Sequence, residues 1–470
     1  MTICAETEDD KRALSGIVVL DFTWVIAGPQ ATRLLGAWGA EVIKVEWPER
    51  PDLARFIHPP PDDVQLDRAT SGEASGLFND FNVNKLGVTL NMSDARGREL
   101  FEKLLKRVDV LAENFSPMAM EKWGYTYEAL HRINPRLVYL SLSGYGHSGR
   151  DRQYVTYGPS AQALGGLTFG AGLPGIEPAG WGYSYLDQVG GYIGAFGVAM
   201  ALIEREKSGR GQQVDLAQSE AGLPLNGPAF LDYTVNGRPG RRPGFPPGNR
   251  STWPGAPQSE GYRSEARMVP HNAYRCAGTD FNDWCVIAVR SDEEWLTLCN
   301  VIGADELREP QFSTLEGRLA HQEQIDSLIG NWTIGLDKYG VMAILQAAGL
   351  AAAAVQSSAD RIERDPQLKA RGLYKELSHP VLGERLFQQV PVKMSKTPPT
   401  LRKHAPLIGS ANADVWQRLA GLSTAEIAAL VKSGVLWPKN MDAPPWIQSG
   451  NNVSSDMSEA PGLSRPRGGV

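Results

Sequence analysis

Residues 16–46 of this 470-residue chain read GIVVLDFTWVIAGPQATRLLGAWGAEVIKVE and contain two apolar runs on either side of a Gly-Pro pair. Residues 16–23 are a β-branched, apolar run with the composition of a buried strand. Gly28 and Pro29 open a helix, because proline is tolerated in the first helical turn. Residues 41–46 form a second apolar strand. Strand, helix and strand in this order predict a parallel pair in one sheet.

The same alternation continues along the first half of the chain. A helix with one apolar face is predicted over residues 93–108, and apolar strands are predicted over residues 109–115 and 137–143. Near-continuous apolar strands that alternate with helices are typical of a parallel sheet covered on both faces. We therefore predict an α/β fold with a doubly wound, mostly parallel sheet.

Changes in composition divide the chain into domains. Glycine, proline, arginine and serine are dense over residues 236–261, as in a long loop or linker. The alanine-rich residues 342–355 and the strand-like residues 387–392 are expected to return to the large domain. The predicted parts are the first part of a large domain (1–225), a Gly/Pro-rich linker and loop (226–268), a smaller α+β domain (269–341), a linker and return to the large domain (342–437) and a disordered tail (438–470).

The charge balance argues against two classes of partner. Lys and Arg number 47 and Asp and Glu number 53, so the net charge is −6, whereas nucleic acids and anionic membranes select for basic surfaces. We expect neither as a partner.

The longest apolar stretch, residues 189–203, is shorter than the roughly 18 residues that span a bilayer. We interpret it as a buried helix.

Cysteines, histidines and the first residues of the chain bear on compartment and metal content. Residues 1–11 are acidic and lack the apolar core of a signal peptide. The four cysteines show no C-x-x-C spacing, and no pair among the seven histidines has metal-ligand spacing on one helix. We expect a protein of the reducing cytoplasm without a metal site.

Residues 144–149, GYGHSG, fit the G-x-G-x-x-G pattern of dinucleotide-binding loops and follow a predicted strand. Two further requirements fail. Residues 150–154 carry no apolar helical stripe, so no helix N-terminus is predicted to receive a pyrophosphate. No acidic residue lies about 20 positions further on. We interpret the match as a chance one in a glycine-rich chain.

Asp187 stands immediately before a predicted long apolar helix that is rich in small residues. It can be a helix N-cap, which is a common role for aspartate. It can also be a carboxylate that the helix N-terminus keeps ionised, next to glycines that allow a ligand to come close. An ionised aspartate in a cleft can attack an acyl group. The residues by themselves do not choose between these roles.

Several motifs follow one another in a fixed order between residues 14 and 436. They are LSGIVVLDFTWVIAGPQATRLLGAWGAEVIKVEWPE from residue 14, DVLAENFSPMAMEKWGYTYEALHRINPRLVYLSLSGYGHSG from residue 109, the Asp187 helix ending in KSGRGQ at residue 212, DPQL at residues 365–368 and APLIG at residues 405–409. Together they resemble the family III CoA-transferases, which include formyl-CoA and carnitine CoA-transferases and the related 2-methylacyl-CoA racemases.

The resemblance implies a role for Asp187, which falls on the catalytic aspartate of that family. In its transferases this carboxylate attacks an acyl-CoA thioester and forms a mixed anhydride. The released CoA thiolate converts the anhydride to an aspartyl-CoA thioester, and an acceptor carboxylate reverses the sequence. The resemblance thus implies CoA thioesters as substrates, with a donor such as succinyl-CoA, and no permanently bound cofactor.

The resemblance also implies a CoA site and an assembly. The family forms an interlocked homodimer of ring-like chains, with a large domain built from both chain ends and a smaller domain. The residues expected to bind CoA are Val25, Ile26, Ala27, Leu90, Asn91, Met92, Asn114, Phe115, Ser116, Lys122, Val155, Thr156, Tyr157 and Gly158. Trp47 stands where some members carry an arginine for a CoA phosphate, so Arg50 or Lys122 is expected to supply that charge.

The chain departs from parts of the family in ways that bear on its reaction. The racemases place a histidine near the position of Tyr157, and a tyrosine is a poor base at neutral pH, so we favour a transferase over a racemase or epimerase. Formyl-CoA transferases have a glutamine at the position of Ile26. Together with Trp24, this suggests an acceptor larger and less polar than oxalate or formate, such as an aromatic or branched carboxylate or a dicarboxylate. A third alternative is a non-catalytic CoA-binding subunit of a hetero-oligomer.

Overall fold

The computed structural model describes residues 12–57, 71–171, 182–237 and 268–437, together with residues 177 and 180. The chain separates into two compact units, each with its own hydrophobic core. The first, larger unit takes its described residues from Met1–Gln162, Gly182–Gly222 and Leu373–Val470, and the second takes them from Ala163–Trp181 and Leu223–Gly372.

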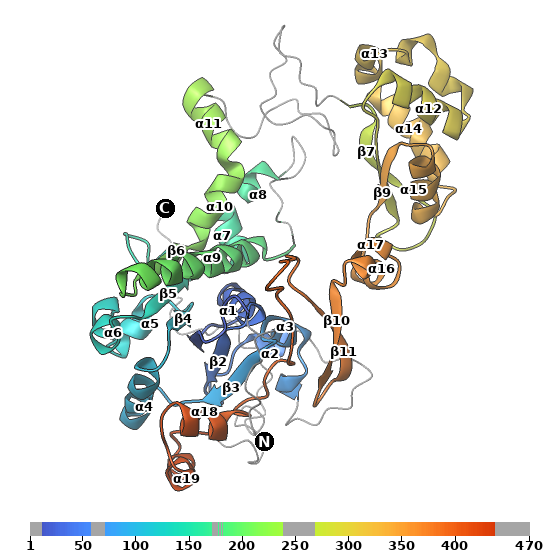
Figure 1. Ribbon diagram of the computed structural model, residues 1–470. Coiled ribbons are helices and arrows are strands. Elements are labelled where there is room, and N and C mark those ends of the chain that lie inside the picture. Colours follow the sequence, from blue (N-terminus) through green and yellow to red (C-terminus); the bar gives the residue numbers. More distant parts are fainter. Residues whose placement is uncertain are drawn as a thin grey trace, which may run out of the picture. The chain divides into compact units, whose positions relative to one another are not determined.

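The larger unit is built on a six-stranded sheet with the order β3-β2-β1-β4-β5-β6 (Figure 1). Every neighbouring pair is parallel. The chain steps outward from β1 to β3 on one side and then returns to add β4 to β6 on the other, so the strand order reverses between β1 and β4. The strands are β1 (Val18–Asp21), β2 (Glu41–Glu46), β3 (Lys85–Thr89), β4 (Val110–Glu113), β5 (Val138–Ser143) and β6 (Gln213–Ala217).

Helices cover both faces of this sheet. Alternate residues of a strand point to opposite faces, and in β1 Val19 joins a core with α1 (Ala27–Ala37) and α9 (Tyr185–Ser208). Leu20 joins a second core with Phe101 of α4 (Ala95–Leu105) and Trp416 of α18 (Asn412–Arg418). The other helices of that second core are α5 (Met118–Lys122), α6 (Tyr127–Ile133) and α19 (Thr424–Lys432).

The predicted fold class is therefore confirmed, including the contribution of both chain ends to the large domain (Figure 1). The remaining elements of this unit are short: α2 (Ala54–Ile57), η2 (Ser71–Glu73), α3 (Gly76–Phe81), α7 (Gly158–Leu164), which runs into the second unit, α10 (Gln218–Gly222) and the hairpin of β10 (Tyr374–His379) and β11 (Gly383–Gln388).

The second unit holds a three-stranded antiparallel sheet, β7-β8-β9. Its strands are β7 (His271–Arg275), β8 (Trp284–Ala288) and β9 (Ala351–Ala354). Its helices are α8 (Leu167–Gly170), η3 (Leu223–Asn226), α11 (Gly227–Asn236), α12 (Asp292–Ile302), η4 (Asp305–Arg308), η5 (Pro310–Phe312), α13 (Leu315–Ala320), α14 (Gln322–Thr333), α15 (Lys338–Ala347), α16 (Ser358–Glu363) and α17 (Pro366–Ala370).

Three expected assignments differ from the structure. We expected residues 1–225 to lie in the large domain, but the described residues of Ala163–Trp181 belong to the second unit. We expected residues 342–355 to return to the large domain, but β9 pairs with β8, so the chain stays in the second unit up to Gly372. We expected the linker to begin at residue 226, but residues 227–236 form α11. The rest of the predicted linker, from 238 to 267, and the predicted tail at 438–470 lie outside the described residues.

The α9 helix differs from the buried helix that we expected over residues 189–203. Among the described helices it alone is long and apolar enough to cross a membrane, by length and composition. Half of its most apolar 18-residue segment is buried. Gly194 and Ala195 are buried. The opposite face carries exposed apolar side chains, here called the α9 stripe: Tyr192, Ile193, Phe196, Met200 and Ile203.

Candidate active site

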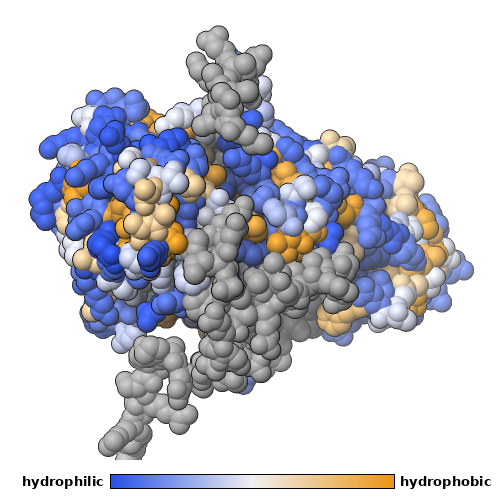
Figure 2. Space-filling view, turned by 90° about the horizontal axis from the view of Figure 1, so that it is seen from below, coloured by the Kyte–Doolittle hydropathy of each residue, from blue (hydrophilic) through white to orange (hydrophobic). Residues whose placement is uncertain are grey.

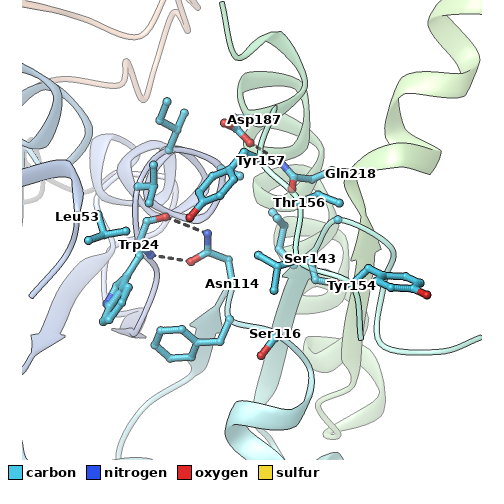
Figure 3. A pocket seen from close by; sticks show the side chains of 17 residues that line it. Trp24, Leu53, Asn114, Ser116, Ser143, Tyr154, Thr156, Tyr157, Asp187 and Gln218 are labelled. Atoms are coloured by element: carbon cyan, nitrogen blue, oxygen red, sulfur yellow. Dashed lines mark hydrogen bonds between the residues drawn. The ribbon is translucent and has the colours of Figure 1, made fainter. Parts of the chain in front are cut away.

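A pocket of about 230 Å³ opens in the larger unit, at the carboxyl ends of the strands where their order reverses (Figure 3). This is where open α/β sheets bind ligands, because the loops after the two diverging strands leave a crevice. Here it is called the Asp187 pocket. Its lining residues are Trp24, Val25, Ile26, Ala27, Leu53, Asn114, Phe115, Ser116, Leu142, Ser143, Gly144, Tyr154, Val155, Thr156, Tyr157, Asp187 and Gln218.

The loop between β1 and α1 forms one wall of the pocket and is held by side chains from other elements. Asn114, which directly follows β4, accepts a hydrogen bond from the Trp24 N–H at 2.6 Å and donates one to the Trp24 carbonyl at 2.9 Å (Figure 3). The Val25 N–H donates to Asp52 Oδ1 at 2.9 Å. In the same loop, the Thr23 carbonyl accepts a hydrogen bond from Lys44 Nζ at 2.7 Å.

These bonds hold an unfavourable backbone conformation. Val25 has a φ of 65°, a region that β-branched residues rarely adopt. Such strain persists only where the surroundings determine the backbone. Lys44 and Asp52 are fully buried and form an ion pair at 2.9 Å. Because both side chains also bond to the main chain of the loop, a charged pair in the core holds the loop in place. The wall of the pocket is therefore preorganised before any ligand binds.

Asp187 projects into the pocket from the first turn of α9. The helix begins at Tyr185 and its N-cap is Ser184, so Asp187 is not the N-cap, which was one of the two roles left open by the sequence. Its carboxylate accepts a hydrogen bond from Gln218 Nε2 at 2.5 Å on Oδ1. The Gly158 N–H and the Ser184 side chain also bond to this carboxylate.

The surroundings of Asp187 allow an ionised carboxylate and leave no room for a side chain at Gly158. Burial raises the pKa of Asp187 above its usual value, and its three hydrogen-bond donors oppose that shift. Aspartate in the first turn of a helix is also stabilised in its charged form by the helix dipole. A Cβ built on Gly158 would lie only 2.7 Å from Asp187 Oδ2. The backbone therefore packs directly against the carboxylate.

The structure brings most of the predicted CoA-binding residues together. Val25, Ile26, Ala27, Asn114, Phe115, Ser116, Val155, Thr156 and Tyr157 line the Asp187 pocket. Gly158 contacts Asp187 itself. Lys122 lies exposed on α5 and lines neither this pocket nor the one described next.

A second pocket of about 250 Å³, here called the Trp47 pocket, shares Trp24 and Phe115 with the first. The predicted Leu90, Asn91 and Met92 line it. It also contains Trp47, Trp123 and the exposed Arg50. The Phe115 ring packs edge-on against Trp24 at 5.3 Å and against Trp123 at 6.0 Å between ring centroids. An aromatic wall thus continues from one pocket into the other.

Some residues of this region were missed by sequence reasoning. Gln218, which holds Asp187, directly follows β6, and a polar residue at the carboxyl end of a parallel strand is the signal that could have found it. Glu113, the last residue of β4, accepts hydrogen bonds from the Phe115 N–H and the Tyr139 hydroxyl, both at 2.9 Å. Burial raises the pKa of Glu113 to about 8.

Two negative expectations can be compared with the structure. Residues 144–149 follow β5 as a turn, in which Gly146 and Gly149 have positive φ, and no helix opens there. In the part of the chain that the structure describes, no three His, Cys, Asp or Glu side chains are grouped so that they could hold a metal ion.

The fold and the motifs agree with comparisons to known proteins. The sequence model of CoA-transferase family III matches residues 14–412. The chain is 32% identical over 428 residues to a formyl-CoA:oxalate CoA-transferase of Streptomyces avermitilis. The aligned region covers 90% of this chain and 100% of that protein. It is 33% identical over 424 residues to one of Escherichia coli, which covers 89% of this chain and 98% of that protein.

A solved structure agrees as well. The crystal structure of a CaiB/BaiF family protein from Brucella suis superimposes with a TM-score of 0.76 at 26% identity, over 87% of this chain and 100% of that one. The α/β chain with a pocket at its strand-order reversal is a CoA-transferase by its fold and motifs. It belongs to CoA-transferase family III.

The packing at Gly158 makes a prediction. Gly158→Ala should lower CoA-transferase activity by about 100-fold, because the new methyl group has to displace the Asp187 carboxylate and misplacement by about 1 Å has an effect of that size. Gly330→Ala in α14 is the matched control, since a Cβ there meets nothing within 4 Å. Steady-state rates of the two variants test this. Equal rates in both would show that the contact is unimportant.

Proposed function

We propose that this protein transfers CoA from an acyl-CoA donor, such as succinyl-CoA, to a carboxylic acid through covalent intermediates on Asp187. The observation that carries the proposal is the position of Asp187. It is a carboxylate in the wall of a preorganised pocket, bonded to Gln218 and packed against the backbone of Gly158. A thioester is reactive enough for such a carboxylate to attack, and a covalent intermediate preserves its energy.

The proposed reaction has four steps. One oxygen of Asp187 attacks the thioester carbonyl, the carbon–sulfur bond breaks, and CoA leaves as a thiolate, so that a mixed anhydride remains on Asp187. The thiolate then attacks Cγ of Asp187, which releases the donor acid and leaves an aspartyl-CoA thioester. The acceptor carboxylate attacks Cγ and expels the thiolate. In the last step the thiolate attacks the acceptor carbonyl, so that a new acyl-CoA leaves and the aspartate is restored.

We place CoA along the two adjoining pockets. The thioester end would lie in the Asp187 pocket, and the nucleotide end would lie in the Trp47 pocket, where aromatic rings can pack against a base. Arg50 is exposed at the Trp47 pocket and can approach a phosphate. Lys122 lines neither pocket, so of the two cations expected to replace the family's arginine, Arg50 is the better placed.

The lining of the Asp187 pocket bears on the acceptor acid. Among its described lining residues are Trp24, Leu53 and Tyr157, but no lysine, arginine or histidine. A second carboxylate bonded directly to the reacting one, as in oxalate, would thus find no cation there, and burying an unpaired charge is costly. The free carboxylate of succinyl-CoA is two methylene groups further from the reacting carbonyl. We propose an acceptor with a single carboxylate and an apolar remainder, unlike the oxalate in the names of the curated relatives.

The alternatives have less support. A racemase needs a second acid or base for the α-carbon proton, and no histidine lines the described part of the Asp187 pocket. A non-catalytic CoA-binding subunit has no need for a nucleophile oriented by a neighbouring amide, as Asp187 is by Gln218.

We also propose a cytoplasmic location. The described cysteines Cys276, Cys285 and Cys299 are free thiols, as is usual in a reducing compartment.

We also propose that the protein is a homodimer in which a second copy covers the α9 stripe. Phe196 is 64% exposed and Ile203 52% exposed, on a helix whose other face is buried against the sheet. The surface in Figure 2 is mostly hydrophilic, with hydrophobic residues in small separate patches, as is usual for a solvent-facing surface. A continuous apolar helix face is instead typical of an interface.

The dimer is tested by the mass in solution. Phe196→Glu should shift the protein from dimer to monomer in analytical ultracentrifugation, because a charge would be buried in the interface. Glu204→Gln, an exposed change on the same helix, should leave a dimer. A monomeric native protein would contradict the proposal.

The catalytic proposal is tested by intact-mass measurement. The native enzyme, mixed with succinyl-CoA, should gain the mass of a CoA thioester, and a panel of acids including oxalate, formate and apolar monocarboxylates should discharge it. Asp187→Ala should lose both adduct and transfer while still binding CoA, because only the nucleophile is removed. Turnover retained by Asp187→Ala would refute the mechanism, and a preference for oxalate or formate would refute the proposed acceptor.

A further inference from the structure

The two oxygens of Asp187 lie in different surroundings. Oδ1 accepts the hydrogen bond from Gln218 Nε2 at 2.5 Å. Oδ2 lies on the side of Gly158, where a Cβ would come within 2.7 Å of it. Oδ1 is thus held by a side-chain amide, while Oδ2 lies against a residue with no side chain. The Gly158 N–H and the Ser184 side chain also bond to the carboxylate. This difference is established before any substrate binds.

Gln218 is held firmly in the position from which it donates. It is the first residue of α10, directly after β6, and only 4% of the residue is exposed. A Cβ on Gly190 of α9 would lie 3.3 Å from Gln218 Cγ, so glycine at 190 leaves the space that Gln218 fills. A Cβ on Gly222 would lie 2.7 Å from Leu186 Cδ1, which shows how closely α10 packs on α9. A donor this constrained has little freedom left to lose in a reaction.

We propose that Gln218 is a catalytic residue that binds the carbonyl oxygen of the aspartyl intermediates, with Oδ2 as the attacking oxygen and Oδ1 as the oxygen that receives negative charge. This inference rests on the proposed function, because it concerns the covalent intermediates on Asp187. It adds a division of labour between the two oxygens, which neither the fold nor the family membership provides.

The chemistry places charge next to this donor twice in each cycle. When the thiolate adds to Cγ of the anhydride, the electron pair of the Cγ–Oδ1 double bond moves onto Oδ1. It returns as the donor acid leaves with Oδ2. When the acceptor carboxylate adds to Cγ of the thioester, the charge again appears on Oδ1 and returns as the thiolate leaves. The amide N–H of Gln218 faces that oxygen in both steps.

The test uses Gln218→Leu, which removes the donor at similar volume, and Glu220→Gln, an exposed change on the same short helix, as the matched control. Each enzyme is loaded with succinyl-CoA, and discharge of the aspartyl-CoA thioester by hydroxylamine is followed by intact mass. Loss of one such donor costs about 100- to 1,000-fold in rate, so discharge of Gln218→Leu should be slower by that factor and discharge of Glu220→Gln unchanged. CoA binding should persist in both variants.

A second measurement separates catalysis from simple positioning. The carbonyl stretch of the thioester, observed by infrared difference spectroscopy with ¹³C-labelled aspartate, should move to higher frequency in Gln218→Leu because a hydrogen bond to the carbonyl oxygen is lost. If Gln218 only orients Asp187, discharge by hydroxylamine and the carbonyl frequency will match the native enzyme, and this inference is overturned. If the native enzyme forms no adduct at all, the proposed function is overturned as well.

Discussion

The pair of hydrogen bonds between the Asn114 amide and the main chain of Trp24 connects the two halves of the sheet at the point where their order reverses. Trp24 follows β1 and Asn114 follows β4, so the bonds join the loops that diverge there. They fix the turn that carries the strained Val25 into the pocket. The pocket at Asp187 exists in this form because the two loops are held together.

Charge in this unit is distributed so that the pocket wall is rigid and its interior is nearly neutral. Lys44 and Asp52 pair beneath the wall, fully buried. Asp187 is the one charged side chain among the described lining residues of the Asp187 pocket. Electrostatic interactions are stronger in such an environment than in water. A carboxylate whose pKa burial has already raised, and which amide and backbone donors hold in place, is suited to attack a neutral thioester.

Sequence reasoning predicted the sheet because residues 16–46 contain a complete strand–helix–strand unit with unambiguous apolar patterns. It identified Asp187 by resemblance, whereas the position of Asp187 within the helix needed the structure. It misplaced β9 because Ala351–Ala354 consists of alanine alone, which is depleted in strands, and its pairing with β8 is a long-range contact. It missed Gln218 because the bond to Asp187 joins residues 31 apart in sequence, in helices that touch only in the fold.

If Asp187 carries the acyl and CoA groups covalently, oxygen atoms must pass between the acceptor acid and this side chain. In the proposed sequence, one oxygen of the acceptor carboxylate remains on Asp187 after each turnover. With an acceptor acid labelled with ¹⁸O at both carboxylate oxygens, the peptide that contains Asp187 should gain ¹⁸O after turnover, and no other peptide should. Efficient CoA transfer with no ¹⁸O in that peptide would show that Asp187 does not carry these groups.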